Sequence, residues 1–256
     1  MSRAAVIDWR RLPLGQGVKL LKAHPCGLAA LEKPAGILSH PNEAGDSSRS
    51  LFTAAYSERE QAFVIGEGAG TVRVWLLHRL DAATSGVILV ASDETVALAV
   101  RAAFEKRGVR KRYLAIVLGH PREKRALWRN NMQVRREAGS IRAAAKGGVL
   151  AETAMRLVRL IPGPPALAAI ELEPLTGRTH QLRFQCARRK LPILGDQNYG
   201  NFRMNRELAR RLGNDRLFLH ARRVEIEFSA PSCGRVNFYA ESPVPKEFAG
   251  FLEGGR

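Results

Sequence analysis

The stretch LLHRLDAATSGVILVAS occupies residues 76–92 and changes character in its middle. Polar and small residues surround Asp81, and from Val87 the chain becomes apolar and rich in β-branched residues. A short apolar run of this kind is typical of a buried strand, and the small residues before it indicate a turn. We therefore expect Asp81 to lie at a corner between two strands, where binding and catalytic side chains are commonly displayed.

The rest of the chain predicts more strands than long helices. The clearest helix pattern is DETVALAVRAAFEKRG at residues 93–108, with acids first, basic residues last and Gly108 in the left-handed cap position. A second helix is expected from about Thr179. Residues 50–63 fit a helix with Ser50 near its cap, residues 121–148 have the composition of a basic loop, and residues 150–161 fit a helix or a strand.

Strands that do not alternate regularly with helices indicate an α+β protein. We expect a mainly antiparallel mixed sheet with flanking helices and loops. The 256 residues allow one large domain or two small ones, and no internal repeat or clear linker divides them. We therefore expect a short basic N-terminal extension over residues 1–25 and a single catalytic domain over residues 26–256.

The charge of the chain is its most unusual bulk property. There are 41 Lys and Arg against 24 Asp and Glu, which gives a formal net charge of +17. Such an excess predicts a polyanionic partner, and nucleic acid is the commonest one. A basic protein without such a partner is the alternative.

Several other classes of protein are disfavoured. The three cysteines show neither disulfide nor zinc spacing, and the six histidines show no His-x-x-x-His pattern, so no metal is expected. The glycines of GEGAG at residues 66–70 lack the Gly-Lys-Ser/Thr ending of a phosphate loop and predict a hairpin turn. No signal-peptide segment and no apolar run of membrane-spanning length is present, so we expect a cytoplasmic protein without a membrane partner.

Three polar clusters stand apart from the apolar strands: HRLDAATSG at residues 78–86, KRY at 111–113 and GRTHQLR at 177–183. Each alone is explained by an ion pair or a packed tyrosine. Together they supply a carboxylate, a flat aromatic surface and a cation, which is the material of a catalytic site.

These clusters resemble the motifs of the RluA-type pseudouridine synthases, which modify rRNA and tRNA. HRLDAATSG is similar to the family's His-Arg-Leu-Asp-x-x-Thr-Ser-Gly signature at every fixed position. LEKPAGILSHP, KRYLAIVLG, TGRTHQLRFQCARRKLPILGDQNYG and LFLHARRVEIEF resemble further blocks of the family, in order, from about residue 28 to residue 243. Members often carry an N-terminal S4 RNA-binding domain, for which the residues before the first block are too few.

The resemblance implies an RNA pseudouridine synthase, an isomerase that acts on structured rRNA or tRNA without a cofactor, a metal or an obligatory protein partner. It implies that Asp81 is the nucleophile, that Arg183 is its cationic partner, and that Tyr113 stacks on the uracil. Leu80 would wall the pocket. The candidate RNA-binding residues are Arg79, Lys111, Arg178, His180, Arg188 and Arg189.

Two rival functions remain open from the residues. A noncatalytic RNA-binding protein on the same scaffold has no need of a carboxylate that faces RNA phosphates. A glycosidase that releases the base needs a positioned water and usually a second acid. Asp196 is the nearest such acid, and we expect it to have a structural role in a turn.

Overall fold

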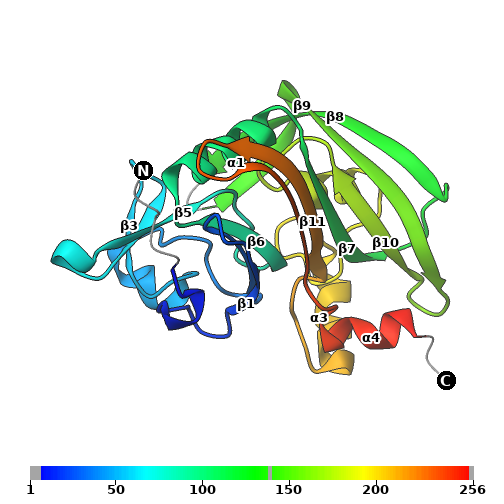
Figure 1. The fold of residues 1–256 in the computed structure, drawn as a ribbon. Coiled ribbons are helices and arrows are strands. Elements are labelled where there is room, and N and C mark those ends of the chain that lie inside the picture. Colours follow the sequence, from blue (N-terminus) through cyan, green and yellow to red (C-terminus); the bar gives the residue numbers. More distant parts are fainter. Residues whose placement is uncertain (1–6, 138–139, 254–256) are drawn as a thin grey trace. The chain divides into compact units, whose positions relative to one another are not determined.

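The computed structural model describes residues 7–137 and 140–253, and these form two compact units. Unit 1 comprises the chain up to residue 109 and residues 221–243, and unit 2 comprises residues 110–220 and the chain from residue 244 (Figure 1). The elements of unit 1 are η1 (Trp9–Arg11), β1 (Lys19–Ala23), β2 (Leu28–Lys33), η2 (Ala44–Arg49), β3 (Ala55–Ser57), β4 (Ala62–Ile65), η3 (Gly68–Gly70), β5 (Val72–Leu76), β6 (Ser85–Ala91), α1 (Glu94–Glu105), β11 (Leu219–Ala230, whose first two residues belong to unit 2) and β12 (Gly234–Glu241).

The central strand of unit 1 is β6, in which every residue is buried. It pairs antiparallel with β2, with Leu28 opposite Ala91, and with β5, which continues into β4 and β3. β1 pairs with the other edge of β2, and β12 pairs with β11. Gly86 in β6 has a φ of +118°, and a Cβ there would lie 2.2 Å from the carbonyl oxygen of Ala221 in β11. Glycine is thus required because β11 passes too close for any side chain.

Helix α1 covers the core of unit 1. The side chain of Asp93 accepts from the N–H of Val96 and caps the helix, and Val96 and Val100 are buried. They pack in one cluster with Leu89 of β6 and with the apolar side chains of β11 and β12. The apolar spacing of residues 93–108 therefore predicted this helix correctly.

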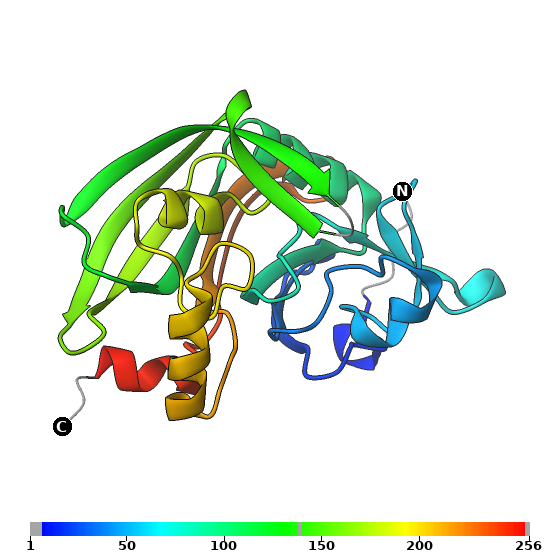
Figure 2. The same ribbon diagram turned by 180° about the vertical axis from the view of Figure 1, so that it is seen from behind.

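The elements described in unit 2 are β7 (Val109–Leu118, whose first residue belongs to unit 1), β8 (Arg125–Glu137), β9 (Ser140–Ile161), β10 (Leu167–Pro174), α2 (Gln181–Arg188), α3 (Phe202–Leu212) and α4 (Lys246–Leu252). The strands form an antiparallel array in the order β7, β10, β9, β8. The helices lie beside these strands, and α3 stands next to α4 (Figure 2). Leu208, Phe218, Phe248 and Phe251 pack in one cluster that joins α3 and α4 to the strands.

The expected α+β class with a mainly antiparallel sheet and flanking helices is confirmed. The helix expected from about Thr179 is present as α2, and GEGAG lies in the β4–β5 hairpin. The boundary between residues 25 and 26 stays a prediction. The residues before it include β1, which pairs with β2.

Three local expectations were wrong. Residues 50–63 are not a helix: Ser50 is buried and donates to the carbonyl oxygen of Phe52, and the segment contains β3 and the start of β4. Residues 121–148 contain the whole of β8 and the start of β9 instead of a loop, and β9 also shows that residues 150–161 are a strand (Figure 1). The left-handed residue after α1 is Arg107 with a φ of 60°, while the N–H of Gly108 bonds back to Ala103.

Candidate active site

Asp81 lies in the loop of residues 77–84 that joins β5 to β6 in unit 1. The N–H of Thr84 donates to the carbonyl oxygen of Asp81 (3.0 Å), which closes a turn directly before β6 begins. The side chain of Asp81 is half-buried, and its neighbour Leu80 is buried. The expected corner between two strands is therefore present, and Asp81 opens its turn.

Lys33 at the end of β2 is fully buried, which is rare for a lysine. Its Nζ donates to the carbonyl oxygens of Pro34 (3.0 Å), Ile37 (2.6 Å) and Ala82 (3.0 Å). The N–H of Gly36 also donates to the oxygen of Ala82 (2.8 Å). The ammonium group thereby ties the Lys-Pro-x-Gly turn to the residue that follows Asp81.

Ser39 holds the residue that precedes Asp81. Its Oγ donates to the carbonyl oxygen of Leu80 (2.8 Å) and accepts from the N–H of Leu80 (3.0 Å). Ser39 and Lys33 together fix the backbone on both sides of Asp81. A backbone fixed in this way keeps the carboxylate in one position, which catalysis requires.

The side chains of Arg79 and His78, which precede Asp81, have different surroundings. Arg79 is exposed and lies 3.3 Å from Nε2 of His40, whose ring stacks on Tyr56. His78 instead accepts from the N–H of Leu89 (3.0 Å) and packs on Phe104, so it supports the fold of the loop. An exposed guanidinium two residues from Asp81 fits the expected RNA contact, which stays a prediction.

Tyr113 and Lys111 lie on β7 in unit 2. Tyr113 is buried and pairs with Leu172 of β10. Lys111 is half-buried, and burial lowers the pKa of its ammonium group. A Cβ at Gly177 would lie 3.8 Å from Nζ of Lys111, so this lysine sits against the start of the GRTHQLR segment. The structure thus brings together two of the three polar clusters seen in the sequence.

Gln181 organises the GRTHQLR segment. Its Oε1 accepts from Oγ1 of Thr176 (2.7 Å) and from the N–H of Arg178 (3.1 Å), and its Nε2 donates to the carbonyl oxygen of Glu152 and to Thr153 in β9. The turn is therefore anchored to the sheet by one buried amide. The guanidinium of Arg178 is exposed and has no partner among residues 7–137 and 140–253, so it is available for an anion.

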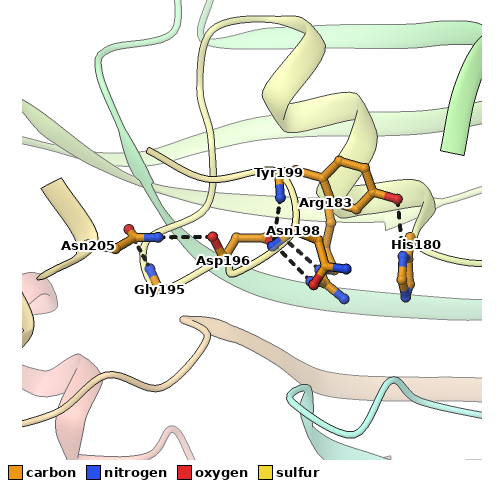
Figure 3. A network of polar contacts seen from close by, with 7 residues as sticks. All are labelled: His180, Arg183, Gly195, Asp196, Asn198, Tyr199 and Asn205. Atoms are coloured by element: carbon orange, nitrogen blue, oxygen red, sulfur yellow. Dashed lines mark hydrogen bonds and ion pairs between the residues drawn. The ribbon is translucent and has the colours of Figure 1, made fainter. Parts of the chain in front are cut away.

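His180 precedes α2 in a left-handed conformation with a φ of 57°. Its Nδ1 lies 3.1 Å from the hydroxyl of Tyr199 (Figure 3). Arg188 is exposed at the end of α2, whereas Arg189 is half-buried over the ring of Trp128 (4.6 Å) and donates to Asn130. The RNA contacts expected for His180, Arg188 and Arg189 stay predictions. An RNA contact of Arg189 would compete with its contacts to Trp128 and Asn130.

Arg183 is buried in α2, and hydrogen bonds to Asp196 and Asn198 hold its guanidinium. Nε and Nη2 donate to the two carboxylate oxygens of Asp196 (2.9 and 2.8 Å), and Nη2 also donates to Asn198 (2.8 Å) (Figure 3). The guanidinium lies 5.5 Å from the centre of the Tyr199 ring. A bidentate pair of this geometry fixes the orientation of the cation as well as its position.

Asp196 is fully buried and accepts from the N–H groups of Asn198 (2.8 Å) and Tyr199 (3.0 Å). Burial alone would raise its pKa, but the hydrogen bonds and charge of Arg183, with these two N–H groups, outweigh burial and lower the pKa. Its carbonyl oxygen accepts from Nδ2 of Asn205, which links the turn to α3 (Figure 3). The expected structural role of Asp196 in a turn is confirmed.

The candidate residues thus divide between the two units. Asp81, Leu80 and Arg79 belong to unit 1, and the remaining candidates belong to unit 2.

Sequence analysis missed the supporting residues Lys33, Ser39 and Gln181. All three lie in the motifs already singled out, but a polar residue beside apolar positions is a weak signal for a supporting role. No group of three or more His, Cys, Asp or Glu side chains in the described part of the chain is arranged to hold a metal ion. None of the helices in that part is long and apolar enough to cross a membrane.

Comparison with known proteins matches most of this chain to one protein family. The family model described as RNA pseudouridylate synthase matches residues 27–188, which include Asp81, Tyr113 and Arg183. A tRNA pseudouridine synthase C of Haemophilus ducreyi is 33% identical over 203 residues, which cover 76% of this chain and 79% of that protein. A ribosomal large subunit pseudouridine synthase C of Vibrio vulnificus is 32% identical over 163 residues, which cover 61% of this chain but 48% of that protein.

Solved structures show the same fold. Human RNA pseudouridylate synthase domain containing 1 superimposes with a TM-score of 0.66 at 20% identity and covers 98% of this chain and 89% of that one. Human RNA pseudouridylate synthase domain containing 4 gives a TM-score of 0.64 at 22% identity.

Proposed function

This chain belongs to the RNA pseudouridylate synthase family and is an RNA pseudouridine synthase, an isomerase, and from that premise we propose that it converts uridine to pseudouridine in tRNA or rRNA with Asp81 as the nucleophile. The reaction breaks the bond between N1 of uracil and C1′ of ribose, turns the base, and joins C5 to C1′. The C5 proton leaves and a proton is gained at N1. No water is added, so one carboxylate suffices.

The observation that carries the assignment of Asp81 is the fixed backbone around it. Lys33 and Ser39 hold the residues on either side, and Asp81 is half-buried between them. A carboxylate held in place can trap or stabilise the positive charge that develops at C1′ when the N1–C1′ bond breaks. Asp196, by contrast, is occupied by Arg183 and two backbone N–H groups.

Arg183 and Tyr113 take the supporting roles. In this proposal the guanidinium of Arg183 faces Asp81 in the catalytic state and favours its charged form. Asp196 and Asn198 keep that guanidinium from reorienting. Tyr113 stacks on the extruded uracil and is a candidate for proton removal at C5. Extruding the base costs a few kcal/mol and is easiest in a loop, and contacts from Arg79, Arg178 and Arg188 to phosphates offset that cost.

The coverage of the relatives favours tRNA over rRNA as the proposed substrate. Those named tRNA pseudouridine synthase C match this chain over about three quarters of both lengths, whereas the Vibrio vulnificus ribosomal enzyme is matched over 48% of its length. We therefore place tRNA first and rRNA second as the substrate. A cytoplasmic location remains a prediction from the sequence.

The test uses unmodified tRNA transcripts and rRNA fragments labelled with tritium at C5 of uridine. Isomerisation replaces the C5–H bond with a C5–C1′ bond, so tritium appears in water. Wild-type protein should release tritium in the presence of excess EDTA, and Asp81→Asn should release none while it still binds the RNA. Substantial release by pure Asp81→Asn would refute the assignment of the nucleophile.

Chromatography of the digested RNA separates the rival functions. Pseudouridine identifies the isomerase, free uracil identifies a glycosidase, and unchanged uridine identifies an RNA-binding protein without activity. A folded Asp81→Asn variant, checked by its thermal unfolding, is the matched control for each product.

A further inference from the structure

Three arginines on α3 face solvent without any partner. Arg203, Arg206 and Arg210 are exposed, and none has a hydrogen bond or ion pair within the described residues. Arg211 on the same helix is different because it pairs with Glu207. Exposed arginines elsewhere in the chain also pair with acidic side chains, as Arg73, Arg129, Arg156 and Arg222 do. We call Arg203, Arg206 and Arg210 the arginine face of α3.

The spacing of the arginine face suits a linear polyanion. Residues three and four apart share one side of a helix, and at about 1.5 Å per residue the three arginines span roughly 10 Å along the axis. Exposed guanidinium groups in such a row bind successive phosphates and release counterions when they do so.

A hollow of about 350 Å³ lies beside the arginine face. It is lined by Phe202, Arg206, Arg210 and Asp215, with Asn205 at its floor. Phe202 is 47% exposed at the first turn of α3, and an exposed aromatic ring next to cations is the usual platform for an unpaired base. Asp215 repels phosphate, so the hollow itself suits a base while the phosphates lie over the arginines.

The hollow adjoins the network around Arg183. Asn205, at its floor, donates to the carbonyl oxygen of Asp196 and accepts from the N–H of Gly195 (Figure 3). Gly195 has a φ of +77°, and a Cβ there would lie 1.8 Å from the carbonyl oxygen of Arg216. The start of α3 is thus fixed to the turn that orients Arg183, and both belong to unit 2. These residues lie outside the match to the family model, which ends at residue 188.

We propose that the arginine face of α3 and the adjoining hollow form a second RNA contact, in which the arginines bind phosphates and Phe202 stacks on an unpaired base. This contact rests on the proposed function in that the bound RNA is the substrate strand. It increases affinity and helps to place the strand, and it takes no part in the bond changes.

The test measures binding of a fluorescent 12-nucleotide oligocytidylate, which contains no uridine and requires no isomerisation. Arg203→Gln, Arg206→Gln and Arg210→Gln should each weaken binding and lower the slope of log K against log salt by about 0.7, and the triple variant by about 2. Phe202→Ala should weaken binding at least about fivefold without a change in slope, because it removes a stack and no charge. Asp215→Asn should tighten binding.

Arg211→Gln is the matched control, since it removes a paired arginine from the same helix. It should leave both affinity and slope close to those of the wild-type protein. Photocrosslinking with 5-iodocytidine in the same oligonucleotide should label the tryptic peptide of residues 191–203, and Phe202→Leu should remove that label. Thermal unfolding of each variant verifies the fold, and all four arginines are exposed.

The inference is overturned if the three face variants behave like Arg211→Gln, or if the crosslinked peptide is a different one. Failure of the proposed function gives another pattern. In that case no tritium is released from tRNA or rRNA, while the dependence of oligocytidylate binding on the arginine face and Phe202 persists.

Discussion

Arg183 and Asp196 form a buried bidentate ion pair that joins α2 to the turn before α3. The two residues are 13 positions apart, and both are almost inaccessible to solvent. Asn198 accepts from Arg183 and two backbone N–H groups donate to Asp196, so both buried charges have hydrogen bonds beyond the pair itself. The pair gives the guanidinium of Arg183 a fixed orientation within unit 2.

Asp196→Asn should destabilise the fold while it leaves a cation at position 183. Removing one partner of a buried pair costs about 3–5 kcal/mol, because the other charge remains buried. We expect the urea midpoint of unfolding to fall accordingly. An unchanged midpoint would show that the pair contributes nothing to stability.

The same pair makes stability depend on acidity. The folded protein holds the pKa of Asp196 below its ordinary value of 3.8. The unfolded chain therefore takes up the proton first as pH falls. The stability contribution is fully present above about pH 5 and is lost as pH falls through the lowered pKa. The gap in urea midpoint between wild type and Asp196→Asn should narrow as the pH falls below about 5, and a gap that widens on acidification contradicts the assignment.

Lys33→Met should reduce turnover more than RNA affinity. The substitution leaves the carbonyl oxygens of Pro34, Ile37 and Ala82 without their shared donor, and Ala82, which follows Asp81, loses one of the hydrogen bonds that hold it. A displacement of about 1 Å at a reacting group lowers rates by roughly a hundredfold. Lys19→Met, at an exposed position of β1 in the same unit, is the control. Single-turnover tritium release and RNA titration on both variants separate the two effects.

An element was predictable from the sequence where its apolar residues are buried at a regular spacing. Helix α1 has a capping Asp93 and buried Val96 and Val100, so its period was visible. Strands β8 and β9 were harder to predict because apolar side chains occupy exposed as well as buried positions. Trp128, Met132, Ala151 and Met155 are buried, whereas Leu127, Val149, Val158 and Leu160 are all more than 40% exposed. Apolar residues at exposed positions obscure the alternation of apolar and polar residues that marks a strand. Residues 50–63 were misleading for another reason, because Leu51, Phe52 and Phe63 are buried at irregular spacing.

The candidate site was predictable only in its motifs. Asp81 and Arg183 were identified because they lie in short motifs that resemble those of the family. The corner at Asp81 was predicted from the change in composition at Val87. The partners that orient them were not found. The bonds of Lys33 to Ala82 and of Arg183 to Asp196 join residues 49 and 13 positions apart, and no local period or spacing encodes such contacts.

RNA binding should depend steeply on salt. The chain carries a formal net charge of +17, and the exposed Arg178 and Arg188 have no acidic partner within the described residues. If about six phosphates of a tRNA are neutralised, affinity should fall roughly a thousandfold between 50 and 200 mM salt. Anisotropy titrations with a tRNA transcript across that range give the slope. A flat response would mean that the positive charge does not form the RNA surface.

Arg183 and Arg178 should affect different kinetic constants. Arg183 is buried and fixed, so we expect its charge to act on the reacting groups, whereas Arg178 is exposed and suits a phosphate. Arg178→Met should raise the RNA concentration needed for half-maximal rate, with a smaller effect at saturation. Arg183→Met should abolish turnover even at saturating RNA, but it also leaves Asp196 buried without its cation.

A double substitution removes that ambiguity. Arg183→Met combined with Asp196→Asn eliminates both buried charges and should be more stable than Arg183→Met alone, yet it should remain inactive at saturating RNA. Asp196→Asn alone keeps the cation and should retain turnover within about tenfold of wild type, since one hydrogen-bonded carboxylate is replaced by an amide. Single-turnover rates at saturating tRNA decide the question. Turnover that returns in the double variant would show that Arg183 acts only by holding the fold, and a chemical step controlled by Arg178 would show that the roles of the two arginines are reversed.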